Sequence, residues 1–185
     1  VSGIVLSSDL TDGYVATLSE GPEESSISLQ VKTGEVKLNS SSRVTAADVL
    51  ARNGVIHVID KVLLPPTVVD LAISNSEFSI LVQAVVKAEL VETLSGAGSF
   101  TVFAPTNAAF QKLFADLGVS GIADLTKEQL TPILLYHVVS GNVLSGELST
   151  GNVSTLNGDI AVNVGSTVTI NGSSKVVLTD VQGSN

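Results

Sequence analysis

The sequence has 185 residues, a formal net charge of −9, no cysteine and an aromatic content of only 4%. A polyanion of this kind repels phosphate backbones and anionic lipid surfaces, which excludes nucleic acid as an expected partner. The absence of cysteine excludes a disulfide framework and a thiolate metal site. No apolar run approaches the roughly 18 residues that would predict a membrane span. Hydrophobic residues make up 44% of the chain, so we expect a packed core of aliphatic side chains.

An internal repeat organises the chain. Residues 1–10 and 139–148 are identical at seven of ten positions. Each copy is followed by short runs of alternating apolar residues with turn residues between them, which is typical of antiparallel strands. In the second copy, Asn157-Gly158 and Asn171-Gly172 are strong hairpin-turn signals. Both copies therefore predict antiparallel, β-rich halves.

The segment between the two copies has the spacing of helices. Pro65-Pro66 ends the first β half, and Thr67 and Asp70 then fit a capping box that predicts the start of a helix. Apolar residues at i, i+3, i+4, i+7 and i+8 predict one apolar helical face. This face consists of Phe78, Leu81, Val82, Val85 and Val86.

A strand and a second helix are expected next. Phe100–Phe103 predicts a short buried strand, after the turn at Gly96-Ala-Gly98. Thr106 can cap an amphipathic helix that ends at Gly118. We expect the helical segment and the second β half to share one core, with buried Phe103, Phe110, Phe114, Leu134 and Leu135.

A further capping box stands at Thr126 and Gln129. Pro132 lies too far along to continue that helix without a kink. We therefore predict a short turn first and a new helix from about Pro132 to Val138.

A helical half followed by a β half makes one α+β unit. We expect residues 66–185 to form such a unit, and residues 1–65 to be the C-terminal, β-rich half of a preceding unit. The second copy stops at Asn185, which aligns with Asn53, so we expect the second unit to lack its last strand. Two explanations stay open: the parent chain is longer, or the strand comes from the Gly54–Pro65 segment, either of another subunit or of the same chain.

Three segments resemble the signature blocks of the fasciclin domain family. Thr101-Val-Phe-Ala-Pro-Thr-Asn-Ala-Ala-Phe110 is similar to the first block, and Leu134-Leu-Tyr-His-Val138 is similar to the Tyr-His block. Gly54-Val-Ile-His-Val-Ile-Asp-Lys-Val-Leu-Leu-Pro65 is similar to the second block. The resemblance covers essentially the whole chain, although the copy with the first two blocks lacks the last one. It implies an α+β fold in which a β-wedge packs against a helical layer.

The resemblance also implies a function. It indicates a non-catalytic adhesion or assembly module without a cofactor, acting through protein partners or through self-association of fasciclin domains. Such a module belongs to a multi-domain or filamentous protein that is extracellular or on the cell surface, or periplasmic in a bacterium. The alternative is a surface domain that binds a small ligand or a polysaccharide. Aromatic platforms usually carry sugar binding, and this chain has two Tyr and no Trp.

Two kinds of candidate site residue follow. A lone histidine on an apolar helical face is usually a hydrogen-bonded structural residue, which is the interpretation favoured for His137. Tyr136 and His137 nevertheless stay adhesion candidates, because the Tyr-His block of the family is linked to receptor binding. His57 lies in the middle of a strand and is also interpreted as structural. The candidate strand donor for exchange between subunits consists of Gly54, Val55, Ile56, His57, Val58 and Ile59.

The motifs of common catalytic and metal sites are absent from the sequence. It contains no Gly-x-Ser-x-Gly elbow, no P-loop, no His-Glu-x-x-His and no calcium-binding loop. We therefore expect no enzyme activity and no metal. The acidic residues Glu20, Glu23 and Glu24 favour a solvated loop over a weak cation site. Three N-glycosylation sequons, which matter only in a eukaryotic host, stand at Asn39, Asn152 and Asn171.

Overall fold

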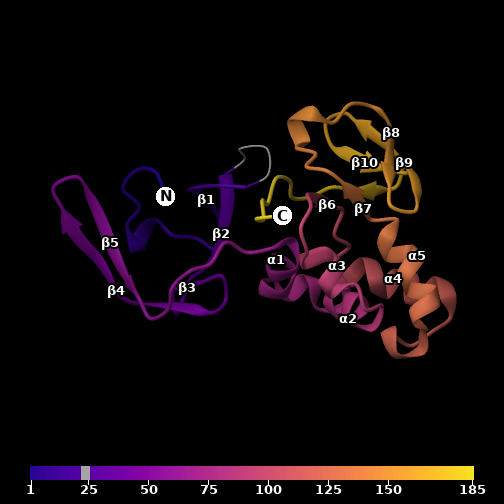
Figure 1. Cartoon of the computed structure of the whole chain (residues 1–185), viewed down its shortest axis with the longest axis horizontal. Coiled ribbons are helices and arrows are strands. Elements are labelled where there is room, and N and C mark those ends of the chain that lie inside the picture. The colour runs from indigo at the N-terminus through magenta and orange to yellow at the C-terminus, as the bar shows by residue number, and fades with distance from the viewer. Residues whose placement is uncertain (22–25) are drawn as a thin grey trace. The chain divides into compact units, whose positions relative to one another are not determined.

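Residues 1–21 and 26–185 are described by a computed structural model (Figure 1). The chain divides into two units: unit 1 contains residues 1–74 and 181–184, and unit 2 contains residues 75–180 and 185. Helices and antiparallel sheets both occur, which confirms the predicted α+β class. The acidic residues Glu23 and Glu24 lie outside the described residues.

Unit 1 contains a five-stranded antiparallel sheet with the strand order β1-β2-β3-β4-β5. A short 3-10 helix, η1 (Ser7–Asp9), precedes it. The strands are β1 (Gly13–Glu20), β2 (Ser26–Lys32), β3 (Lys37–Leu38), β4 (Ser42–Ala51) and β5 (Gly54–Ile59).

Strand β2 is the centre of the core of unit 1. Its alternating apolar residues bury Ile27 and Val31, as the period of two predicts. The opposite face of β2 is polar but also buried, so its side chains need hydrogen-bond partners. Gln30 donates through Nε2 to the carbonyl of Ser74 at 3.0 Å. The N–H of Ser28 donates to the carbonyl of Gln182 at 2.8 Å, which attaches residues 181–184 to this strand.

Helix α1 (Val68–Ser74) begins at the predicted capping box. The N–H of Thr67 donates to Asp70 Oδ2 at 2.9 Å, and the N–H of Asp70 donates to Thr67 Oγ1 at 3.2 Å. This helix approaches the 181–184 segment closely. A Cβ at Gly183 would lie 3.1 Å from the backbone nitrogen of Val68, so any larger residue here would press on the backbone at the start of α1.

Strands β4 and β5 form a long hairpin that runs side by side in Figure 1. Val49 lies opposite Ile56, and Ala46 lies opposite Val58. The register shifts twice along the pair, and each shift places an extra residue in β4. Strand β5 is therefore regular, while β4 is bulged. Asp48 lies at one of these bulges in the left-handed conformation, with φ +57°.

The helical half of unit 2 follows α1 in the chain. Its elements are η3 (Ser76–Phe78), α2 (Ser79–Lys87), α3 (Val91–Ser95), α4 (Asn107–Leu117), η4 (Ile122–Asp124) and α5 (Lys127–Leu135). The predicted caps are confirmed. Thr106 accepts from the N–H of Ala109, Gly118 ends α4 with φ +67°, and Thr126 and Gln129 form a capping box.

The prediction that Pro132 separates a turn from a new helix is wrong, because α5 runs from Lys127 to Leu135 through the proline. Proline removes only one backbone hydrogen bond at this position. Leu130 and Leu134, on either side of it, are buried and hold the helix in place. The predicted apolar helical face is only partly buried. Leu81 and Val85 are buried, whereas Val86 is exposed; Ala84 of α2 and its C-cap residue Ala88 are buried instead.

Within the described part of the chain, no single helix is long and apolar enough to cross a membrane. One pair of helices, Val68–Ser74 with Ser76–Lys87, meets the length and composition criteria together but is bent by 106°.

Unit 2 contains two sheets. Strand β6 (Phe100–Val102) pairs with β7 (Val138–Ser140), and a four-stranded sheet has the order β11-β10-β9-β8. Its strands are β8 (Gly151–Thr155), β9 (Gly158–Val164), β10 (Val168–Ile170) and β11 (Ser174–Lys175), and η5 (Ser145–Glu147) precedes them. The predicted turns are confirmed: Asn157-Gly158 joins β8 to β9, and Asn171-Gly172 joins β10 to β11.

The core of unit 2 contains side chains from both its helices and its sheet. Phe110, Phe114 and Leu134 are buried as predicted. Ile160 and Val162 of β9 are buried as well, each only 2% exposed. Two expected core residues, Phe103 and Leu135, are instead half-buried. Phe103 follows the last residue of β6, and Leu135 is the last residue of α5, so both lie where a regular element ends.

Candidate functional site

Tyr136 joins the helical and β parts of unit 2. It is the C-cap residue of α5 and is half-buried. Its hydroxyl donates to the carbonyl of Asp159 at 2.9 Å and accepts from Asn171 Nδ2 at 3.1 Å. The polar end of the side chain is therefore engaged by the first residues of β9 and by the turn after β10. A second hydrogen bond joins the same two parts of unit 2, because Asn157 Nδ2 donates to the carbonyl of Pro132 at 3.0 Å.

His137 is held by the same junction. Its Nδ1 lies 2.8 Å from the carbonyl of Ile133, so this nitrogen carries the proton and donates. The carbonyl of His137 accepts from the N–H of Phe103 at 2.9 Å, which connects the end of α5 to β6. The rings of Tyr136 and His137 meet edge-on, with centroids 6.3 Å apart. These contacts fit a structural role; an adhesive role for the pair stays a prediction.

The candidate strand donor is placed in the other unit. Residues 54–59 form β5 of unit 1, where they pair with β4 and take no part in the β8–β11 sheet. Tyr136 and His137 belong to unit 2. The two kinds of candidate residue therefore do not belong to one site within a unit, and donation of the strand to another subunit stays a prediction.

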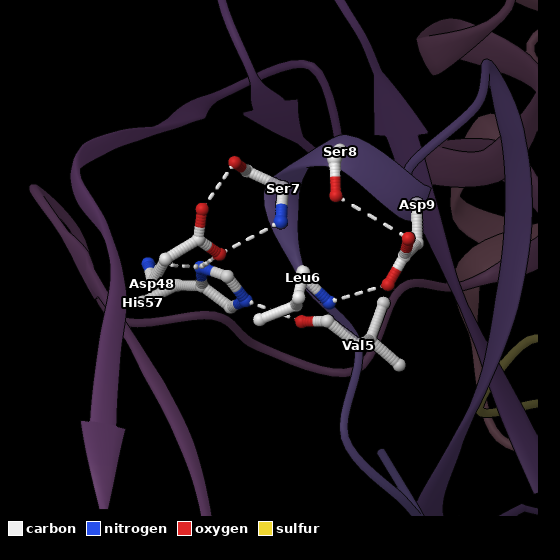
Figure 2. Close-up of polar contacts among 7 residues, drawn as sticks. All are labelled: Val5, Leu6, Ser7, Ser8, Asp9, Asp48 and His57. Atoms are coloured by element: carbon white, nitrogen blue, oxygen red, sulfur yellow. Dashed lines mark hydrogen bonds and ion pairs between the residues drawn. The ribbon is translucent and has the colours of Figure 1, made fainter.

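The structure also contains a polar cluster that sequence reasoning did not predict (Figure 2). The N–H of Ser7 donates to Asp48 Oδ1 at 2.8 Å, and its hydroxyl donates to Asp48 Oδ2 at 2.5 Å. The hydroxyl and N–H of Ser7 hold the pKa of Asp48 below its ordinary value. We call this pair of hydrogen bonds the Ser7–Asp48 clasp. It connects the N-terminal segment to the bulge of β4.

His57 completes the cluster. Its Nε2 lies 2.9 Å from the carbonyl of Val5, and its Nδ1 lies 3.4 Å from the backbone nitrogen of Asp48. Serine, histidine and aspartate are the residue types of a hydrolase triad, but the connections differ. The hydroxyl of Ser7 points at the carboxylate, and the imidazole Nε2 meets a backbone carbonyl. The serine therefore has no histidine base, and the cluster serves to attach the N-terminal segment to the hairpin.

Unit 2 repeats the clasp with equivalent residues. The N–H of Ser145 donates to Asp180 Oδ1 at 2.7 Å, and the hydroxyl of Ser145 donates to Asp180 Oδ2. Asp180 has φ +57°, the same value as Asp48. The internal repeat was the only sequence signal for this site, since Ser7 and Asp48 are 41 residues apart.

Two of the three N-glycosylation sequons occupy equivalent positions in the two copies of the repeat. Asn39 and Asn171 are equivalent turn residues with φ +48° and +49°. The Oδ1 of each accepts a strand N–H, from Gln30 at 3.0 Å and from Ala161 at 2.9 Å. Asn152 is different, because it is an exposed residue of β8. Within the described residues, no group of three or more histidine or acidic side chains is placed to hold a metal ion.

The geometry defines a repeated α+β module in which sheets, short helices and serine–aspartate clasps recur. Residues 1–65 and 76–185 match the family model of the Fasciclin domain, and the chain belongs to that family. The resemblance read from the sequence blocks is thereby confirmed. The structure is similar to that of a FAS1 domain pair from the insect cell adhesion molecule Fasciclin I, with a TM-score of 0.58 and 21% identity over 93% of this chain and 62% of that chain. That likeness supports the fold.

Several proteins are similar in sequence to parts of this chain. Protein sll1483 of Synechocystis is 44% identical over 93 residues, which are 50% of this chain and 52% of that protein. Transforming growth factor-beta-induced protein ig-h3 of Sus scrofa is 41% identical over 110 residues, which are 56% of this chain and 16% of that protein. Human periostin is 38% identical over 82 residues. The chain thus spans about half of the first relative and much less of the others.

Proposed function

We propose that this chain is a non-catalytic adhesion or assembly module that works through protein–protein contacts outside the cell or at its surface. Membership of the Fasciclin domain family supports this function. The solved domain pair with a similar fold comes from a protein described as a cell adhesion molecule. A place in a larger multi-domain or filamentous surface protein is part of the same proposal.

One observation carries the proposal: the β4–β5 hairpin presents large apolar side chains to solvent. Their exposed fractions are 47% for Val49, 73% for Leu50, 56% for Ile56 and 46% for Val58. Single exposed apolar residues are ordinary on protein surfaces, but a contiguous group of them marks an interaction site. Val49 and Ile56 are direct cross-strand neighbours and Val58 shares their face of the hairpin, so these three side chains are contiguous, whereas Leu50 points to the opposite face.

Tyr136 and His137 have an indirect role in the proposed function. Their polar atoms bond to Asp159, Asn171 and Ile133 within unit 2. We propose that they support adhesion by holding the end of α5 on the β8–β11 sheet. A direct contact of the Tyr-His block with a receptor would instead make attachment depend on these side chains even when the fold is intact.

Attachment to a coated surface tests the function. The chain is immobilised at graded densities, and the binding of cells and of purified matrix proteins is measured against heat-denatured chain. We expect saturable binding of a protein partner by the folded chain. A glycan array on the same material tests the polysaccharide alternative. Binding to glycans without any protein binding would overturn the proposal, and so would a hydrolase screen that found turnover.

A further inference from the structure

We propose that Asn171 is a site of spontaneous deamidation, and that the hydroxyl of Tyr136 sets the rate of this reaction. The residue belongs to the Asn171-Gly172 turn between β10 and β11. Water is the only co-reactant that the reaction requires. The hydrogen bond between Tyr136 and Asn171 thus protects a side chain from chemical change, in addition to joining α5 to the β8–β11 sheet.

Deamidation of an asparagine begins at the peptide nitrogen of the residue that follows it. The nitrogen of Gly172 attacks Cγ of Asn171, so that a bond forms between these two atoms and the bond from Cγ to Nδ2 breaks. The amide nitrogen leaves as ammonia and takes the proton that the Gly172 nitrogen loses. Water then opens the cyclic imide at either of its two carbonyls, and the product is an aspartate or an isoaspartate.

Gly172 provides an unhindered nucleophile. Glycine has no side chain to shield its peptide nitrogen, and a Cβ at this position would meet no atom within 4 Å apart from those of its chain neighbours. Among the residues that the structure describes, none accepts a hydrogen bond from the N–H of Gly172. Asn171 and Gly172 are both exposed, so water reaches the turn. The freedom of the asparagine side chain therefore limits the reaction.

Two hydrogen bonds hold the side-chain amide of Asn171. Its Oδ1 accepts from the N–H of Ala161 at 2.9 Å, and its Nδ2 donates to the hydroxyl of Tyr136 at 3.1 Å. Cγ carries both of these atoms, so the amide must leave its partners before Cγ can approach the nitrogen of Gly172. The first bond involves the backbone of β9, whereas the second depends on a single hydroxyl. Tyr136 therefore controls how often Asn171 is free to react.

Asn39, the equivalent turn residue of unit 1, shows why the following residue matters. It has φ +48°, and its Oδ1 accepts from the N–H of Gln30, as that of Asn171 accepts from Ala161. The residue after it is a serine, however, and the hydroxyl of Ser40 donates to Gln30 Oε1 at 2.9 Å. This side chain hinders the peptide nitrogen and is itself fixed. Asn39 should therefore react much more slowly than Asn171.

Asn157 provides the complementary comparison, because a glycine follows it as well. Its Nδ2 donates to the carbonyl of Pro132 at 3.0 Å and not to the hydroxyl of Tyr136. The two asparagines of unit 2 thus share a dipeptide sequence and differ in the group that holds the amide. Removal of the Tyr136 hydroxyl should change the rate at Asn171 alone.

The product changes the junction at the end of α5. A carboxylate cannot donate a hydrogen bond, so the hydroxyl of Tyr136 loses the donor that it has at residue 171. The reaction also adds a negative charge to a chain whose net charge is already −9. An isoaspartate in addition places its Cβ in the backbone, which lengthens the turn between β10 and β11. Deamidation therefore weakens the connection between α5 and the β8–β11 sheet.

Site-resolved mass spectrometry of the aged chain tests this site. The 185-residue chain, produced without N-glycans, is incubated in mildly alkaline buffer, and conversion of Asn171, Asn157 and Asn39 is followed in the same digests. Asn171 should convert more slowly in the folded chain than in the chain unfolded in urea. Tyr136→Phe should accelerate conversion at Asn171 about fivefold, the effect of one hydrogen bond on a local opening equilibrium. The rate at Asn157 should not change.

His137→Ala is the matched control, because it removes a different hydrogen bond of the same junction and keeps the hydroxyl of Tyr136. It should leave the rate at Asn171 as it is in the unchanged chain. Circular dichroism checks that both variants are folded.

Three outcomes would overturn the proposed site. The first is an Asn171 that stays an amide in the Tyr136→Phe chain while the unfolded chain converts. The second is a rate at Asn171 that Tyr136→Phe leaves unchanged. The third is an equal acceleration at Asn171 by His137→Ala, or an equal acceleration at Asn157 by Tyr136→Phe. Either result of the third kind would show a general loosening of unit 2 instead of control by the Tyr136 hydroxyl.

Discussion

Strand β4 and its counterpart in unit 2 have related sequences and different structures. Residues 42–51 form a ten-residue strand beside β5. In unit 2 the equivalent segment begins with the two-residue strand β11, and residues 176–180 are irregular. Both segments contain several β-branched residues, and both contain the aspartate that accepts from the serine of the clasp, which is Asp48 in unit 1 and Asp180 in unit 2. A paired neighbour therefore decides the length of the strand more than local preference does.

Burial shows a second contrast between the two units. Ile160 and Val162 of β9 and Ile56 and Val58 of β5 have the same alternating pattern. The first two are buried in unit 2, and the last two are exposed in unit 1. The pattern states which residues share a face of the sheet. Whether that face is covered depends on what packs against it, which the alternating pattern does not state.

The largest expected effect is in the core of unit 2. Phe110→Ala should lower the free energy of unfolding by about 3–5 kcal/mol, because it removes a buried aromatic ring and leaves a cavity. Urea unfolding followed by circular dichroism measures this change. Leu117→Ala on the same helix is the control, since that side chain is half exposed. A loss below about 1 kcal/mol for Phe110→Ala would show that this core is assigned wrongly.

A matched pair of substitutions compares the two units directly. Val31 in β2 and Val162 in β9 occupy equivalent positions, and each is only 2% exposed. Val31→Ala and Val162→Ala should each destabilise their unit by about 2 kcal/mol, through lost apolar burial and a small cavity. Thermal unfolding of both variants checks this. If Val31→Ala had no effect, unit 1 would lack the core that its burial indicates.

His137→Ala should destabilise unit 2 by about 1 kcal/mol, the usual contribution of one intramolecular hydrogen bond. The lost bond runs from Nδ1 to the carbonyl of Ile133. Tyr136→Phe, which removes only the hydroxyl, is the companion variant and should act in the same direction. Unfolding and surface attachment are measured together. Full stability combined with selective loss of attachment would support a direct receptor contact of the Tyr-His block instead.

The smallest effect concerns the Ser7–Asp48 clasp. Because Ser7 lowers the pKa of Asp48, the clasp contributes stability above the ordinary aspartate pKa and loses it as pH falls through the lowered native value. Asp48→Asn should therefore destabilise unit 1 at neutral pH, and its difference from the unchanged chain should shrink in acid. Thermal unfolding over a pH series measures this difference. A difference that grew toward acid would contradict the clasp.

Local signals in the sequence predicted local structure well. The capping boxes at Thr67 and Thr126 and the turn at Asn157-Gly158 all depend on residues within a few positions of each other. The features that the sequence did not predict depend on tertiary packing. Pro132 remains inside α5 because buried leucines flank it, and Val86 is exposed because α2 presents its alanines to the core.

The candidate site was less predictable than the fold. The role of Tyr136 and His137 was inferred from a family block, and their bonding partners in β9 and β10–β11 became apparent only in the structure. The cluster of Ser7, Asp48 and His57 joins residues that are distant in sequence. The exposure of β5 could not be predicted either, since an alternating apolar strand predicts burial on at least one face.

Hydrogen exchange of β5 and β9 tests the central claim most directly. In dilute solution, the amides of β9 should be strongly protected, and the amides on the outer edge of β5 should exchange rapidly, since no strand of the described residues covers that edge. Equal protection of both strands would contradict the account.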